Sequence, residues 1–148
     1  MQYKKLENTY IVRVEKGEEA IEKLTELCEK ENIKVGSITA IGATNRAELL
    51  WYDPDKKEYS EKTLEGENYE VTSFIGNITR KNEKPLDNAR GKPYLHCHIV
   101  LGDRDFKTYA GHCKSAIVSG AFEAVIEIKE GEIGREHDES VGLNLLKF

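Results

Sequence analysis

Alternating apolar and polar positions predict β-strands along most of the chain, with one clear exception. Residues 10–17 combine β-branched side chains with a closing glycine, which is typical of a strand that ends in a turn. Residues 18–32 instead repeat apolar side chains at helical spacing, with glutamates and lysines on the other face, and so predict an amphipathic helix. Small residues and glycines in residues 33–45 indicate a largely buried strand that neighbouring backbone approaches closely.

The middle of the chain is predicted to be a run of strands separated by turns. Residues 53–58 begin with Asp-Pro-Asp, and residues 65–68 read Glu-Gly-Glu-Asn, so we expect a turn between two strands at each position. A polar loop with two prolines should follow over residues 80–93.

The last third of the chain continues the β pattern. Residues 94–102 predict a strand and residues 103–105 a tight turn. Residues 106–131 should then form two further strands, broken near Gly120. The tail, residues 132–148, is acidic at first and apolar at its end, so we expect that end to pack back onto the domain.

These elements together predict an α+β fold, with one main helix and a large mixed, mainly antiparallel β-sheet. The short connections favour antiparallel pairing of neighbouring strands. The strand–helix–strand segment at the start of the chain offers one place for a parallel pair. A length of 148 residues suits a single domain, which we assign to residues 1–148.

Composition narrows the classes of function. The formal net charge of −5 argues against a dedicated stand-alone nucleic-acid binder, which is usually basic. Three cysteines without a Cys-x-x-Cys pair fit a reducing compartment. No apolar run approaches the roughly 18 residues of a membrane span, and the first ten residues lack the apolar core of a signal peptide. We therefore expect a cytoplasmic protein that has no membrane partner.

Residues 79–93 are nevertheless locally basic, with five basic side chains against two acidic ones. These side chains are Arg80, Lys81, Lys84, Arg90 and Lys92, against Glu83 and Asp87. The segment contains Arg-Gly-Lys-Pro, close to the Arg-Gly-Arg-Pro core of an AT-hook, which binds the A·T minor groove. A four-residue match is explained better by chance than by a true AT-hook. A solvated loop or a contact with a neighbouring subunit is therefore the simpler interpretation of this segment.

Three of the four histidines lie close together in the sequence and suggest a metal site. His96 and His98 occupy alternate positions of one predicted strand, so their side chains should project from the same face, with Cα atoms about 6.5–7 Å apart. His112 lies on the next predicted strand and can fold back over that face. Three imidazoles with a fourth position open to water describe a catalytic type of zinc site, and imidazole also suits other transition metals.

Two other interpretations of this segment stay open. The histidines could be unrelated core or surface residues. Alternatively, Cys97 or Cys113 could be a nucleophile beside a histidine base, although sequence neighbours on a strand face opposite ways. The fourth histidine, His137, lies in the acidic tail, where we expect a solvated loop residue.

Ordered motifs across almost the whole chain resemble the PPC domain. This plant-and-prokaryote domain occurs alone in bacteria and archaea and fused to AT-hooks in plant nuclear proteins. The matching stretches are YIVRVEKGEEAIEKL, IKVGSITAIGATNRAELLWYD, YEVTSFIGNI, PYLHCHIVLGDRD and YAGHCKSAIV.

The resemblance implies a homotrimer, and it implies zinc on the residues that match His96, His98 and His112. The fold it implies is similar to that of acetolactate decarboxylase, a metal-dependent lyase with a three-histidine zinc. The sequence departs from the family pattern at Ala110, where many members have the first glycine of Gly-Gly-His. If the backbone there had a positive φ, alanine would be disfavoured at this position.

Three functions follow as hypotheses. The first is a metalloenzyme acting on a small carbonyl or carboxylate compound, with zinc, or else iron, nickel or manganese. Such chemistry normally uses a carboxylate for proton transfer and a cation for an anionic substrate, and Glu70 and Arg46 are our candidates. The second is DNA binding or a DNA-associated regulatory role. The third is a structural trimer that uses zinc as a staple.

Overall fold

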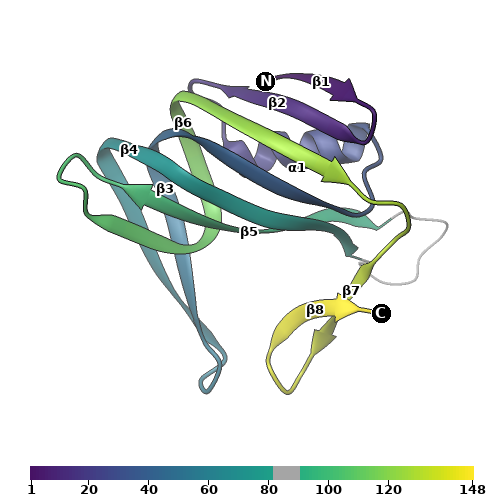
Figure 1. Cartoon of the computed structure of the whole chain (residues 1–148). Helices are drawn as coiled ribbons and strands as arrows, with labels where there is room; N and C mark the ends of the chain where they lie inside the picture. The colour runs from purple at the N-terminus through teal and green to yellow at the C-terminus, as the bar shows by residue number, and fades with distance from the viewer. Residues whose placement is uncertain (82–90) are drawn as a thin grey trace.

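A computed structural model describes residues 1–81 and 91–148 of the chain (Figure 1). These residues form one helix, α1 (Ala20–Lys30), and eight strands. The strands are β1 (Gln2–Leu6), β2 (Thr9–Glu15), β3 (Gly36–Asp53), β4 (Glu58–Lys81), β5 (Lys92–Gly102), β6 (Thr108–Ile128), β7 (Gly134–Asp138) and β8 (Leu143–Lys147). Within the described residues, no helix has the length and apolar character needed to cross a membrane.

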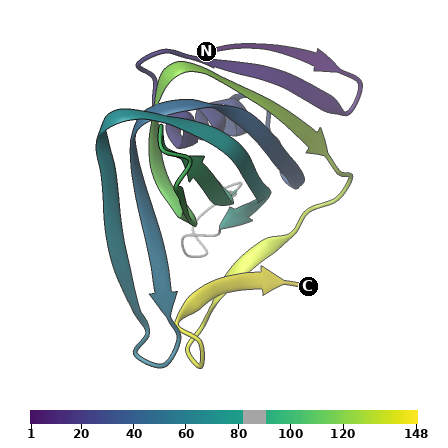
Figure 2. The ribbon, with the colours of Figure 1, turned by 60° about the vertical axis from the view of Figure 1, so that its left-hand side comes forward.

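The strands form one mixed sheet, which confirms the predicted α+β class. Four strands close a ring, because β3 pairs with β4, β4 with β5, β5 with β6, and β6 again with β3. Figure 2 shows the sheet curling so that β5 lies between β4 and β6. The strands β1 and β2 extend the sheet beyond β6, and the β7–β8 hairpin extends it beyond β4.

The parallel strand pair does not lie where we predicted it, in the strand–helix–strand segment at the start of the chain. Strands β2 and β3, which α1 connects, lie on either side of β6 and are antiparallel to it, so they do not pair with each other. The parallel pair of the sheet is instead the short contact between β4 and β7, where Arg80 lies opposite Gly134.

Two expected chain breaks are β-bulges rather than turns. The turn at residues 53–58 is confirmed, since β3 ends at Asp53 and β4 begins at Glu58. At residues 65–68, however, β4 continues through Gly66, which has a φ of +92°, and the register with β3 shifts there. The break near Gly120 is also wrong, because β6 continues through it with a register shift against β3. A β-bulge, like a turn, favours residues such as glycine that can adopt unusual backbone conformations, so the two features look alike in the sequence.

The core lies between the curled sheet and α1, which packs against β5 and β6. The predicted helix is confirmed, and its apolar stripe is buried. In the core, the rings of Phe74 from β4 and Phe122 from β6 meet edge to face, with centroids 5.1 Å apart. The other face of β5 and β6 lacks a helix, and the candidate site lies on that face.

The predicted basic loop is only partly within the described residues. Lys84 and Arg90, with the acidic Glu83 and Asp87, lie outside them. Arg80 ends β4 and is 3% exposed. Its guanidinium donates hydrogen bonds to the backbone carbonyl oxygens of Ile33, Cys28 and Gly91, and it pairs with the Glu29 carboxylate at 3.2 Å. Arg80 therefore fixes the end of α1 against the sheet.

We expect Arg80→Ala to lower the free energy of unfolding by about 2–4 kcal/mol, because several buried carbonyl groups lose their donor. The matched control is Glu29→Gln, which should cost less than about 1 kcal/mol because the Glu29 side chain is 61% exposed. Urea unfolding followed by far-ultraviolet circular dichroism measures both. Equal effects of the two variants would contradict the interior role of Arg80.

Candidate metal centre

The side chains of His96, His98 and His112 converge on one face of the sheet. Antiparallel pairing of β5 with β6 sets His98 directly opposite His112, so His112 folds back over the same face, as predicted. His96 lies two residues earlier on the same face of β5. One ligand nitrogen from each ring can be chosen so that all three lie within 4.8 Å of one another, and the ring centroids are 5.2–5.6 Å apart.

The neighbouring cysteines face the core instead. Cys97 and Cys113 are 0% and 3% exposed, because strand alternation turns them away from the histidines. Burial, more than any neighbour, raises the pKa of the Cys97 thiol to about 12 and also raises that of Cys113. Both thiols are therefore protonated at neutral pH and do not serve as nucleophiles toward the histidine face.

The environment favours the neutral form of His96 and His112. Burial, followed by the proximity of His96 and His98, lowers the pKa of His112 to about 4. Burial also lowers the pKa of His96, and the positive charge of Arg135 adds to this effect. Neutral imidazole is the form that binds a metal ion.

The three histidines fit a metal ion such as Zn²⁺. Nitrogen ligands at about 2.1 Å in tetrahedral directions lie about 3.4 Å apart, so small rotations of these rings would bring the nitrogens into place. All three histidines line a cavity of about 700 Å³, a size that suits a small-molecule ligand.

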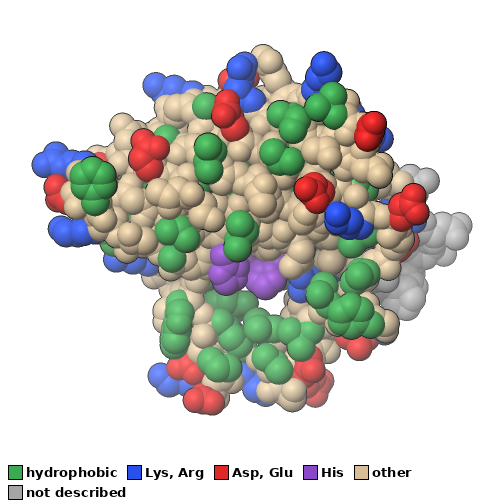
Figure 3. Space-filling model, in the orientation of Figure 1, with side chains coloured by type: hydrophobic (Ala, Val, Ile, Leu, Met, Phe, Trp, Pro, Cys, Tyr) green, Lys and Arg blue, Asp and Glu red, His purple; other side chains and the backbone are tan. Residues whose placement is uncertain are grey.

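Two hairpins form the walls of this cavity. Figure 3 shows the histidines at the edge of the hollow between these arms. One arm joins β3 to β4 and contributes Leu50, Trp51, Tyr52 and Tyr59. The other, β7–β8, contributes Arg135, His137, Gly142, Leu143, Asn144 and Leu145, while Tyr94, Ala110 and Gly111 line the floor with the histidines.

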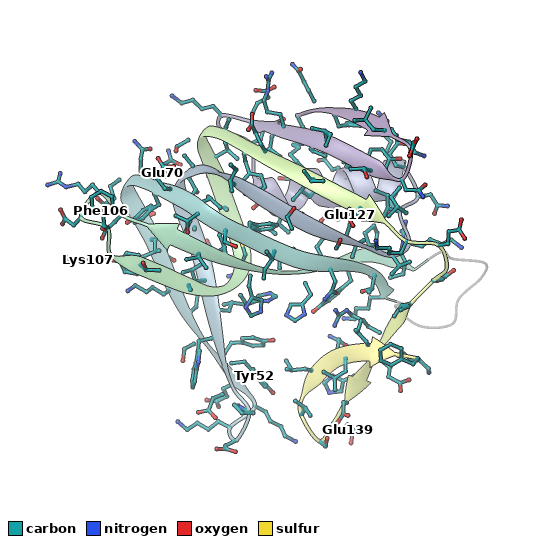
Figure 4. The ribbon with its side chains drawn as sticks, viewed as in Figure 1. Tyr52, Glu70, Phe106, Lys107, Glu127 and Glu139 are labelled. Carbon is teal, nitrogen blue, oxygen red and sulfur yellow. The ribbon has the colours of Figure 1, made fainter. Side chains whose placement is uncertain are left out.

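The tips of the two arms touch. The Tyr52 hydroxyl donates a hydrogen bond to the carbonyl oxygen of Val141 at 2.5 Å, and the Lys57 ammonium donates to that of Glu139 at 2.5 Å. Tyr52 and Glu139 lie near the facing ends of the arms in Figure 4. The tail therefore folds back through the turn of the β7–β8 hairpin, but the expected packing of its apolar end is wrong, because Leu145, Leu146 and Phe148 are exposed.

The predicted catalytic residues lie outside the cavity lining of their own chain. Glu70 is exposed near the middle of β4, away from the hairpin arm (Figure 4), where it lines a separate groove with Thr72 and Glu123. Arg46 is partly exposed and pairs with the carboxylates of Glu48 and Glu65. A catalytic role for Glu70 and Arg46 stays a prediction.

The cavity contains a cation that the sequence analysis missed. This cation is Arg135, which is 8% exposed. His137, two residues later, is exposed as expected. It belongs to strand β7, however, and not to a loop. The tail pattern gave no signal for Arg135, because its acidic surroundings in sequence suggested a solvated surface. No carboxylate is among the described residues that line the cavity.

The departure at Ala110 does not disturb the backbone. Ala110 lies within β6 opposite Val100, and its φ is not positive. The glycine that the geometry needs is Gly111, where an added Cβ would lie 3.0 Å from the carbonyl oxygen of Leu50. The backbone can therefore present His112 with alanine at position 110.

Comparison with known proteins places these features in a family. The Plants and Prokaryotes Conserved (PCC) domain matches residues 1–129. A search of curated proteins gave no match. Among solved structures, a candidate DNA-binding protein from Bacteroides thetaiotaomicron is 35% identical, with a TM-score of 0.89 over 99% of this chain and 96% of that one.

Two archaeal structures are also similar. A metal-containing protein from Archaeoglobus fulgidus is 30% identical, with a TM-score of 0.83 over 100% of this chain and 99% of that one. A plant- and prokaryote-conserved (PPC) protein from Pyrococcus horikoshii is 31% identical, with a TM-score of 0.82 over 99% of this chain and 95% of that one. Since the domain match spans most of the chain, this chain belongs to the Plants and Prokaryotes Conserved domain family, the PPC family that its motifs resemble.

Proposed function

We propose that this protein is a cytoplasmic homotrimer that holds one zinc ion per chain on His96, His98 and His112 and acts on a small carbonyl or carboxylate compound. Iron, nickel or manganese could take the place of zinc. The observation that carries the proposal is the convergence of three imidazoles, with ligand nitrogens within 4.8 Å, at the wall of a cavity. The metal-containing relative from Archaeoglobus fulgidus supports it.

Around the metal, the residues of this chain would bind and orient the compound. A bound zinc ion would supply Lewis-acid polarisation of a carbonyl oxygen or a bound water with a pKa near 7. Arg135 would attract an anionic group. Burial, followed by the charges of Tyr94 and Tyr52, raises the pKa of Tyr59, so its phenol is protonated at neutral pH and suited to donate a hydrogen bond. The aromatic walls would exclude water.

Trimer formation is supported by an apolar patch on the helix-free face. A cross-strand row runs from Ile11 through Val125, Thr39 and Ile75 to His98. Ile11, Ile75 and Val125 are 45%, 56% and 37% exposed, and Ile41, beside this row, is 60% exposed. Exposed apolar residues grouped in this way favour a protein interface.

The trimer also provides a role for the two predicted catalytic residues. Glu70 and Arg46 do not line the cavity of their own chain. They would serve catalysis by reaching the metal of a neighbouring subunit, which requires that the cavity lie between subunits.

The second candidate function is a DNA-associated regulatory or assembly role. The candidate DNA-binding relative from Bacteroides thetaiotaomicron favours it. In that role, or in a purely structural trimer, the metal would act as a staple that stabilises the fold.

We expect purified protein to contain about one metal ion per chain, and the double variant His96→Ala, His98→Ala to contain none. Inductively coupled plasma mass spectrometry measures the content, and His137→Ala is the matched control that should retain the metal. A wild-type protein that stays metal-free after incubation with Zn²⁺ would contradict the metalloenzyme proposal and favour the assembly or DNA-associated role.

We expect the stability of the metal-free protein to fall as the pH falls from about 6.5 toward 4. The folded state keeps His112 neutral to about pH 4, while an unfolded histidine takes up a proton near pH 6.5. The unfolded state therefore binds more protons in this window, and acid favours unfolding. His112→Asn should lose less stability over the same window. Urea titrations at pH 7, 6 and 5 test this, and parallel curves for the two proteins would contradict it.

We expect wild-type protein to have about three times the 16.8 kDa chain mass in sedimentation velocity. The double variant Ile11→Lys, Ile41→Lys should be monomeric, because charges on the apolar patch oppose its burial. The control Phe106→Asn changes a 93% exposed side chain in the β5–β6 turn and should leave the mass unchanged. A trimer that survives the double variant would place the interface elsewhere.

A further inference from the structure

Arg135 is a buried cation that has no described counter-ion. Its three guanidinium nitrogens donate to neutral acceptors: Nε to the Thr79 hydroxyl at 2.9 Å, Nη2 to the Asn77 side-chain oxygen at 2.7 Å, and Nη1 to the Asn144 carbonyl oxygen at 2.7 Å. A guanidinium has five N–H groups, so two remain for a further acceptor. Within residues 1–81 and 91–148, no carboxylate lies at ion-pair distance from Arg135.

Arg80, the other buried arginine among the described residues, has a structural role and serves as a comparison. Arg80 is 3% exposed, and its guanidinium reaches three backbone carbonyl oxygens and the Glu29 carboxylate. Arg135 is similarly buried but has three neutral acceptors and lines a cavity. Burying a cation without an opposite charge is expensive. An anion in the cavity would relieve that cost.

Arg135 also lies beside the histidine cluster. Its acceptor Asn77 is directly opposite His96 in the β4–β5 pairing, and such pairs have Cβ atoms about 5 Å apart. Its guanidinium lies 4.6 Å from the ring centre of Tyr94, which is two residues before His96 and about 7 Å away along the strand. The Arg135 guanidinium and the histidine cluster are therefore separated by about 7 Å, the length of two residues along a β-strand.

The charge of the cavity favours an anion. The described lining has one arginine and three clustered histidines but no carboxylate. A divalent metal on those histidines would add two further positive charges. Cations in a partly enclosed, low-dielectric cavity attract negative ligands strongly.

We propose that the cavity binds a small 2-hydroxy or 2-oxo carboxylate, with its carboxylate on Arg135 and its second oxygen toward the metal on His96, His98 and His112. This inference rests on the proposed metal site. The two groups of such a compound are on adjacent carbons, so they can span the short distance between the arginine and the histidines. Leu50 and Tyr52 provide an apolar wall for the rest of a small molecule.

The test is isothermal titration calorimetry of the zinc-loaded protein with lactate as the probe. Its neutral amide, lactamide, has the same shape and hydroxyl group but no charge. We expect wild-type protein to bind lactate at least tenfold more tightly than lactamide. The variant Arg135→Met should lose about 10–100-fold in lactate affinity and bind the two compounds alike. Arg135→Lys should keep a preference for lactate, with less affinity, because lysine lacks the planar fork.

Zinc content and far-ultraviolet circular dichroism, measured on the same samples, separate the two proposals. Zinc retained by Arg135→Met together with unchanged lactate affinity would overturn the role of Arg135 and leave the metal site intact. Equal affinity of the wild type for lactate and lactamide, or no binding of either, would overturn the carboxylate proposal without any variant. Failure of the wild type to bind zinc would overturn the proposed function itself.

Discussion

Antiparallel pairing of β5 with β6 sets His98 opposite His112, and the candidate site is arranged around that register. The alternation that turns the histidines outward turns Cys97, Ile99 and Leu101 inward, and all three are fully buried. A slip of one residue would exchange the two sets, placing imidazoles in the core and apolar side chains in the cavity. The packing of the core therefore also selects which face holds the histidines.

Two hairpin arms turn that face into a cavity. The β3–β4 arm is long because each bulge lets a strand bend without ending. The arms meet where Gly142 approaches Tyr52: an added Cβ at Gly142 would lie 2.6 Å from the Tyr52 hydroxyl oxygen, and its φ is +78°. The backbone conformation favours glycine there, and an added side chain would also require the Tyr52 hydroxyl to shift.

Local patterns made much of this structure predictable. The helix follows from its apolar stripe, and the approach of His112 to His98 follows from strand alternation and a tight turn. The bulges at Gly66 and near Gly120 were mistaken for chain breaks, because a bulge and a turn call for the same residues. The edge strand β1 was missed because most of its side chains are exposed and polar. Arg135 was missed because it reaches Thr79 and Asn77 through tertiary contacts, 56 and 58 residues away in sequence.

The enclosed position of Arg135 favours a small anion over a polyanion as the ligand of the cavity. A nucleic-acid surface needs accessible cations that follow a phosphate backbone. In this chain Arg80 is buried in carbonyl contacts, and Arg46 and Lys114 are paired with glutamates, while the net charge is −5. Arg135, in contrast, is enclosed beside the histidines and retains donor capacity that protein acceptors do not use. A compact ligand with one or two negative charges can reach this position, whereas a phosphate backbone would have to enter between two hairpins whose tips are in contact.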